Sequence, residues 1–292
     1  MLFQPCFSSL GCPDIGIEEL CAIAVNPDHR IPGAAPCIEI RSLEGTADYP
    51  GKLAESPEAL RHAVAKTKAA GIEVRLVGSS LHLSQNTSAD LAALLKCGRV
   101  ADAFGARYVR VFGGGSAEPK GMSPKEIAHA ASLYIEAVRY FESEGINAEI
   151  VVETHGRLVT ADLVLQLCDQ AAQPVPLLWD THHTWKIGGE SLTSTYTAIA
   201  PLVRHMHGKD SRVDPQHKKG YRYMFAGEGE FPFAELFALL QDTPPEAEEI
   251  TPALSLEWEL MWNRDLPPLE PALSAWMRKL APHLNLAQGV NK

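Results

Sequence analysis

The chain has 292 residues, of which 46% are apolar and 21% are charged, and its formal net charge is −10. This length and apolar content allow a large buried core and exceed what most simple β-sandwiches need. The acidic balance argues against nucleic acid and anionic membranes as partners, because both attract broad basic surfaces.

Short apolar runs alternate with longer amphipathic stretches along the chain. The runs are rich in Val, Ile, Leu and Phe, as expected of parallel strands that are buried on both faces. In chain order they cover Leu2–Phe7, Ala35–Ile40, Glu73–Val77, Tyr108–Phe112, Ala148–Glu153, Val175–Asp180, Val203–His207 and Ala253–Trp258. Helical patterns fill most gaps, at Gly16–Ala24, Pro57–Ala70, Thr87–Phe104, Ser123–Ser143, Thr160–Ala172, Ser191–Ala200, Phe233–Leu240 and Pro271–Leu280. Ser56 and Ser123, each followed by Pro, are typical helix N-caps.

Eight strands, each followed by a helix, predict an α/β protein with one domain over residues 1–292. The expected fold is a closed (β/α)8 barrel, also called a TIM barrel. An open doubly wound sheet is the alternative, but no Gly-x-Gly-x-x-Gly follows the first strand and Gly113–Gly115 lacks the Lys-Ser/Thr of a P-loop. The polar segment from Asp210 to Pro232 is predicted to be a long loop of functional importance.

The cellular location is predicted from what the sequence lacks. The N-terminal residues have neither the basic nor the apolar region of a signal peptide, and no run is long enough to span a membrane. The six cysteines show no C-x-x-C spacing, which favours free buried thiols. We therefore expect a cytoplasmic protein.

Metal-binding types of side chain stand at the ends of the last four predicted strands, in VVETHG, LLWDTHH, RHMHGKD and LSLEWEL. The active site of an α/β barrel lies at this edge, and several carboxylates buried there without a cation would cost several kcal/mol each. Depth in the strand favours His207 over His205, and position favours Glu257 over Glu259. The sequence therefore predicts one divalent metal ion held by Glu153, Asp180, His207 and Glu257.

The predicted ligand set also indicates a type of chemistry. Three carboxylates and one imidazole favour Mn²⁺, Mg²⁺ or Co²⁺, and Zn²⁺ is a further candidate. Four protein ligands leave two positions on an octahedral ion, which the carbonyl and hydroxyl oxygens of an α-hydroxy ketone would fill. The ion would stabilise the enediolate formed when Glu153 or Glu257 removes the intervening proton, and the other carboxylate would return one.

The order of these motifs resembles the xylose isomerase-like barrel superfamily, the sugar phosphate isomerase and epimerase group related to endonuclease IV. The resemblance begins with GIEEL and CIEIRSLEG and continues through VRLVGSSLHL and YVRVFGGG. It is most specific in VVETHG, the D-x-x-H that ends at His183, the H-x-H-x-K-D that starts at His205, the Gly-Glu-Gly at 227–229, and SLEWE. It implies the same four metal ligands, a contact of His183 with a substrate oxygen, and an arginine, Arg212, that holds the substrate. Ketose epimerases of the group carry a second Glu where this chain has THGRLV.

A metal-dependent sugar or cyclitol isomerase/epimerase, with a small polyol or sugar as substrate, is therefore the predicted function. The alternative is a metal-dependent dehydratase, a lyase of the inosose or 3-dehydroshikimate type. It is favoured by His155, an extra acid–base group near Glu153, and by Arg110, Lys209 and Arg212, which could hold a carboxylate.

Two further alternatives stay open. An endonuclease IV-like hydrolase is remote, because the fourth strand ends without the histidine that such a centre needs and the net charge opposes DNA. The other alternative is a non-catalytic, metal-stabilised barrel. The sequence is also compatible with a homo-oligomer. Glu39 and Arg41 share one face at the end of the second strand, where they would form a structural ion pair unless they have a role at the site.

Overall fold

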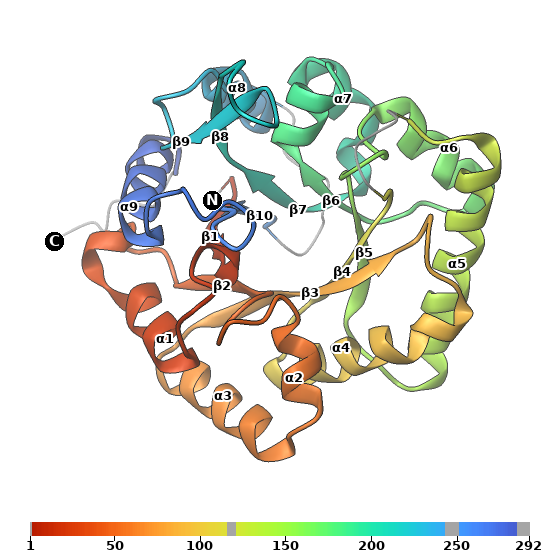
Figure 1. The fold of residues 1–292 in the computed structure, drawn as a ribbon, viewed down its shortest axis with the longest axis horizontal. Coiled ribbons are helices and arrows are strands. Elements are labelled where there is room, and N and C mark those ends of the chain that lie inside the picture. Colours follow the sequence, from red (N-terminus) through yellow and green to blue (C-terminus); the bar gives the residue numbers. More distant parts are fainter. Residues whose placement is uncertain (1, 116–120, 243–250, 285–292) are drawn as a thin grey trace, which may run out of the picture.

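The computed structural model describes residues 2–115, 121–242 and 251–284, which form a closed barrel of eight parallel strands (Figure 1). Around the barrel the order is β1-β10-β7-β6-β5-β4-β3-β2. The strands are β1 (Gln4–Ser8), β2 (Cys37–Ile40), β3 (Glu73–His82), β4 (Tyr108–Phe112), β5 (Glu149–Glu153), β6 (Leu177–Asp180), β7 (Val203–Gly208) and β10 (Ala253–Leu256). The predicted (β/α)8 barrel is confirmed, and the open sheet is wrong.

Helices surround the barrel (Figure 1). They are α1 (Ile17–Val25), α2 (Tyr49–Ala54), α3 (Pro57–Ala69), α4 (Leu91–Phe104), α5 (Pro124–Ser143), α6 (Ala161–Ala171), α7 (Leu192–Ile199), α8 (Phe233–Asp242) and α9 (Leu269–Leu280). Ser56 and Ser123 cap α3 and α5 as predicted, since each hydroxyl accepts a backbone N–H of the first turn. The short helix α2 was not predicted; Asp48 caps it by accepting the N–H of Gly51.

The segment predicted as a long loop after the seventh strand contains an antiparallel hairpin, β8 (Asp210–Val213) and β9 (Tyr221–Met224). The segment forms a strand here because buried and exposed residues alternate in β9. Tyr221 and Tyr223 are buried, while Arg222 between them is exposed. The Asp210 carboxylate anchors the segment by accepting the backbone N–H groups of Ser211, Gly227, Gly229 and Phe231. The hairpin is thereby fixed at the end of β7.

Apolar side chains from several strands form buried clusters in the barrel. Leu76, Tyr108, Val151 and Leu178 form one buried cluster, and Cys6, Cys37 and Ala253 form another. All six cysteines are free thiols, and five of them are buried. The buried Arg75 donates to Gln4 and to the Thr251 carbonyl near the amino ends of the strands. Glu153, Asp180 and His207 are buried toward the carboxyl ends, where the sequence predicts the site.

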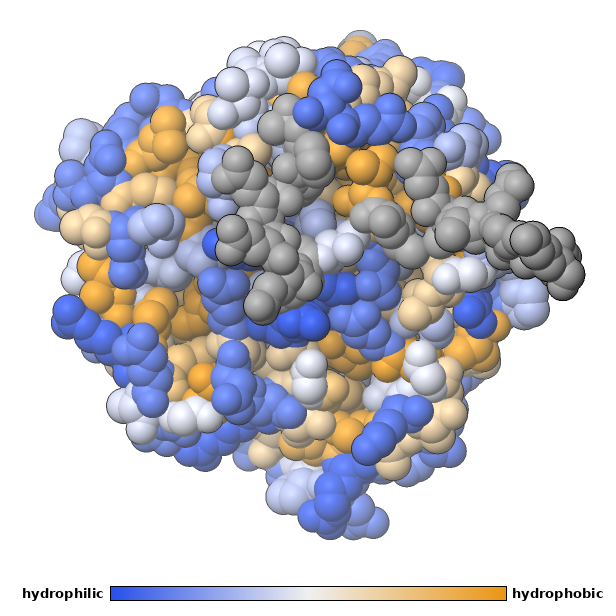
Figure 2. All heavy atoms as spheres, turned by 180° about the vertical axis from the view of Figure 1, so that it is seen from behind, coloured by the Kyte–Doolittle hydropathy of each residue, from blue (hydrophilic) through white to orange (hydrophobic). Residues whose placement is uncertain are grey.

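The outer surface of the described residues is mixed in character. Apolar and hydrophilic residues are interspersed on the face that Figure 2 shows, as on most globular proteins. The large apolar side chains that are exposed, Leu165, Val213 and Trp262, lie far apart in the chain. Among the helices of the described segments, none is long and apolar enough to cross a membrane.

Candidate metal centre and active site

Four buried side chains meet at the carboxyl ends of the strands. Glu153 ends β5, Asp180 ends β6, His207 lies in β7 and Glu257 directly follows β10. Each offers a ligand atom, and these atoms all lie within 4.8 Å of one another. The parallel register explains the meeting, because His207 pairs with Asp180 on one side and with Ser255 on the other. The structure thus brings together the four residues that the sequence singles out.

The donor atoms of this cluster fit a cation. The Nδ1 of His207, both carboxylate oxygens of Glu153 and Oδ2 of Asp180 are buried and make no hydrogen bond of good geometry among the described residues. Glu153 and Asp180 do have cationic side chains within ion-pair distance. The Nδ1 of His207 lies 3.3 Å from Oε1 of Glu153 and 3.5 Å from Oε1 of Glu257. The carboxylate oxygens of Glu153, Asp180 and Glu257 that face this nitrogen lie within 4.8 Å of one another, so they repel one another unless positive charge lies between them. The buried acidic and imidazole groups can therefore bind a metal ion, and the oxygen-rich donors suit a divalent one.

Lys209 supplies positive charge on the hairpin side of the cluster. The whole residue is only 1% exposed. Its Nζ lies 2.9 Å from Oδ2 of Asp180 and donates to Glu257 and, at 3.1 Å, to Glu259. Lys209 follows β7 directly, and its Nζ contacts two of the candidate ligands, Asp180 and Glu257. Its predicted contact with a substrate carboxylate stays a prediction.

Arg110 supplies positive charge from β4. Its Nε lies 3.1 Å from Oε2 of Glu153, and its guanidinium also donates to the backbone carbonyl of Ser79 at 2.8 Å. The guanidinium carbon lies 3.8 Å from the ring centroid of Phe112, a cation–π contact. Gly78 leaves room for it, since a Cβ there would lie 3.1 Å from an Arg110 nitrogen. Arg110 is therefore held in one orientation beside Glu153.

The carboxyl groups of the cluster differ in proton affinity. Burial, reinforced by Glu257 and Glu153, outweighs the attraction of Lys209 and raises the pKa of Asp180 to about 6. Burial acts on Glu257 as well, but Lys209 and His207 outweigh it and hold the pKa of Glu257 well below its ordinary value. Groups whose environments separate their pKa values in this way are typical of acid–base sites.

Two histidines border the cluster on the β5 and β6 side. The rings of His155 and His183 lie 4.3 Å apart, and the His155 ring lies 4.9 Å from that of Phe112. His183 starts a π-helical turn after β6, and its backbone N–H donates to Asp180. The Nδ1 atoms of both imidazoles are buried and have no hydrogen-bond partner among the described residues. Burial lowers the pKa of His183 well below its ordinary value, which favours the neutral ring.

Arg212 lies apart from this group. It is exposed on β8, and its guanidinium donates to the backbone carbonyl of Glu228. The exposed part of β8 is its second half, because Asp210 and Ser211 are buried whereas Arg212 and Val213 are exposed. Its contact with a substrate stays a prediction.

The hairpin contributes two residues that sequence reasoning missed. Tyr223 donates its hydroxyl to Glu259 at 2.6 Å, and the Nζ of Lys219 lies 3.0 Å from the other oxygen of Glu259. Glu259 in turn accepts from Lys209, so the hairpin is tied to the candidate ligands. The alternation of Tyr221 and Tyr223 could have indicated a strand with one buried face, but it does not identify the partner.

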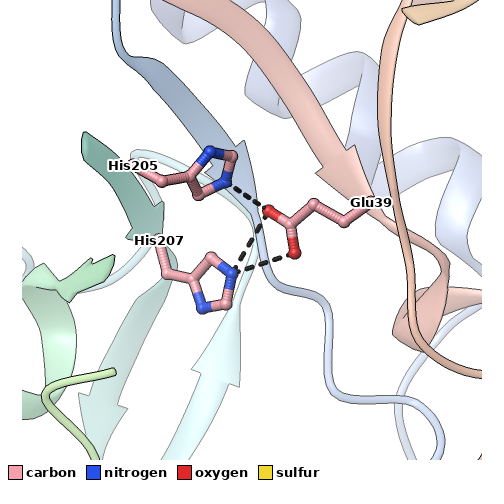
Figure 3. Close-up of side chains that lie close together, drawn as sticks. All are labelled: Glu39, His205 and His207. Carbon is pink, nitrogen blue, oxygen red and sulfur yellow. Dashed lines mark hydrogen bonds and ion pairs between the residues drawn. The ribbon is translucent and has the colours of Figure 1, made fainter. Parts of the chain in front are cut away.

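Glu39 does not form the structural ion pair with Arg41 that the sequence left open. Its carboxylate accepts hydrogen bonds from His205 and His207 (Figure 3). Arg41 donates instead to Ser80 and to a backbone carbonyl. Glu39 is therefore linked to a candidate metal ligand.

A family model described as the xylose isomerase-like TIM barrel matches residues 36–280, so the chain belongs to this family and the expected resemblance is confirmed. One similar solved structure is the probable 3-DHS dehydratase AsbF from Bacillus anthracis. It is 19% identical, with 95% of this chain and 98% of that chain covered and a TM-score of 0.71.

Two other solved structures are similar at a TM-score of 0.69 and 14% identity. They are an IOLI protein with a bound zinc atom, covering 96% of this chain and 98% of that one, and a D-allulose 3-epimerase from Methylomonas sp., covering 97% of each. No curated protein matches the chain significantly. At these identities the likeness establishes the fold, and the reaction has to be inferred from the site.

Proposed function

We propose that this protein is a divalent-metal-dependent sugar or cyclitol isomerase/epimerase. The observation that carries the proposal is the buried convergence of two proton-transfer candidates, Glu153 and Glu257, with Asp180 and His207 on one point. Mn²⁺, Mg²⁺ or Co²⁺ suits these donors best, and Zn²⁺ is a further candidate. The zinc atom of the IOLI structure and the epimerase in the same fold are consistent with this choice.

When bound, a divalent cation would stabilise the negative charge that develops on neighbouring carbonyl and hydroxyl oxygens of the substrate. Glu153 ends β5 and Glu257 follows β10, and two other strands separate β5 from β10 in the barrel, so the two carboxylates approach a substrate carbon from different directions. One can remove its proton and the other can return one. Arg110 lowers the pKa of Glu153 and Lys209 that of Glu257, despite their burial, so both are ready to accept a proton at neutral pH.

A metal-dependent dehydratase is the second candidate, and the position of His155 favours it. Its ring lies against that of His183, and Glu153 is two residues earlier in the chain. Loss of water requires an acid that protonates the departing hydroxyl, which an imidazole can supply. Arg110 and Lys209 could bind the carboxylate of an acidic substrate. The fold likeness to a probable 3-DHS dehydratase agrees with this reading.

Proton NMR in D₂O with the metal-loaded protein separates the two reactions. Ketoses, inososes and 3-dehydroshikimate are the substrates to compare. Deuterium at the α-carbon together with a rearranged sugar supports the isomerase, and His155→Ala should leave this exchange largely intact. An unsaturated product favours the dehydratase, in which His155→Ala should abolish water loss while exchange continues. Metal-loaded protein that exchanges no proton in any of these substrates would contradict both.

A further inference from the structure

We infer that Glu39 is a positioning residue of the metal centre, which acts through His207 and does not touch the substrate. The inference rests on the proposed function, because it concerns the ion that the proposed reaction needs. Glu39 lies in β2, three strands away from β7 around the barrel. Its carboxylate reaches across the interior to the two histidines of that strand (Figure 3).

The two nitrogens of His207 face different partners. Its Nε2 lies 3.0 and 3.2 Å from the two oxygens of Glu39. Its Nδ1 faces Glu153 and Glu257, at 3.3 and 3.5 Å. A hydrogen bond from Nε2 keeps the ring proton there and leaves the lone pair on Nδ1 free for a metal ion. Glu39 therefore selects the tautomer and the ring orientation that the candidate site requires.

His205 holds Glu39 in place. It precedes His207 by two residues on the same strand, so both side chains point into the barrel. Its Nε2 lies 2.6 Å from Oε1 of Glu39. All three side chains are at most 2% exposed, and a carboxylate buried so deeply is retained only where donors satisfy it. With two imidazole donors, Glu39 has little freedom to move away from His207.

A separate metal ion between these three residues is the competing interpretation, since their donor atoms also lie within 4.8 Å of one another. It requires His207 to bind one ion through each nitrogen, with its ring fully deprotonated. Hydrogen bonds from Nε2 need only the ordinary neutral imidazole. The two interpretations differ in the number of ions per chain, which a metal count reveals.

The affinity of the full-length, metal-free protein for Zn²⁺, measured by competition with a chromophoric chelator, tests the role of Glu39. Glu39→Gln should weaken binding by roughly 10–100-fold, the usual effect of removing the partner of a metal-bound histidine. Glu73→Gln is the matched control, because Glu73 pairs with Arg75 at the other end of the barrel; its affinity should stay at the wild-type value. Wild-type affinity in Glu39→Gln would overturn the inference.

A second measurement on the wild type does not depend on how a variant folds. In zinc-loaded protein with ¹⁵N-labelled imidazoles, NMR should show His207 with a protonated Nε2 and a metal-bound Nδ1. The reverse assignment, or two ions per chain, would overturn the inference. If Glu39→Gln weakens zinc binding and the wild type turns over no candidate substrate, the positioning role stands and the proposed reaction fails. If the wild type turns over a candidate substrate and Glu39→Gln binds zinc as tightly as the wild type, the proposed reaction stands and the positioning role fails.

Discussion

Replacing Lys209 with Met should destabilise the metal-free protein, because three buried carboxylates share its ammonium group. Asp180, Glu257 and Glu259 all contact its Nζ, and none of the three side chains is more than 9% exposed. Met keeps most of the apolar stem, so the substitution removes charge with little loss of packing. Breaking a buried ion pair by removing one partner costs about 3–5 kcal/mol, because the remaining charge is left uncompensated. We expect the free energy of unfolding to fall by about this amount.

The loss should depend on pH. The pKa of Asp180 is about 6 in the folded protein, above its ordinary value, and removal of Lys209 would raise it further. A carboxyl group with a raised folded-state pKa binds more protons folded than unfolded, so it lowers stability as pH rises. Protonation of Asp180 at pH 5 should therefore relieve part of the strain that Lys209→Met causes, and the loss should be greatest near pH 8.

Urea unfolding in the presence of a chelator, followed by circular dichroism at both pH values, measures this effect. Lys219→Met is the matched control, because Lys219 contacts only Glu259 of these carboxylates and its side chain is 30% exposed; it should cost no more than about 1 kcal/mol. Excess Mn²⁺, at about a hundred times its dissociation constant for this variant, should raise the free energy of unfolding of Lys209→Met by about 2.7 kcal/mol. If Lys209→Met loses no more than the control at pH 8, the carboxylates do not depend on this ammonium group.

Two further predictions concern the proposed chemistry. Glu257→Gln keeps the side-chain shape but removes a charged ligand and a proton carrier, so turnover at saturating metal should fall about a hundredfold or more; initial rates within a few-fold of wild type would assign the proton transfer to another residue. Protein purified without added metal should carry one divalent ion per chain by mass spectrometry, because the four ligands form one cluster. Three zinc ions per chain would instead favour an endonuclease IV-like centre.

The barrel could be predicted because its strands are buried on both faces, which makes their apolar runs almost continuous. Boundaries were less predictable where polar residues belong to a strand. The apolar run of the third strand ends at Val77, yet β3 continues to His82 through Gly78 and two serines. The pairing with β4 shifts register there, which a pattern of single residues does not reveal.

The four candidate ligands could be located because each ends or follows an apolar run, and parallel strands bring those ends to one edge. Contacts across the barrel could not be located in this way. Glu39 and its partner His205 are far apart in the chain, and the stagger of the strands decides that Glu39 meets His205 and His207 while Arg41 does not. The position of Lys219 similarly depends on the hairpin register, which the anchoring of Asp210 helps to set.

Charge balance gives an argument for a divalent ion that does not depend on ligand geometry. The connected, buried or half-buried groups at the barrel mouth comprise five carboxylates and three cationic side chains: Glu39, Glu153, Asp180, Glu257 and Glu259 with Arg110, Lys209 and Lys219. If only these ion-paired groups are counted, and the imidazoles are neutral as metal binding by His207 requires, the negative charges exceed the positive charges by two. Without an ion, protons can relieve them, which agrees with the raised pKa values of His207 and Asp180. A divalent cation would relieve both, so the network as a whole, and not only its four ligand atoms, favours one such ion.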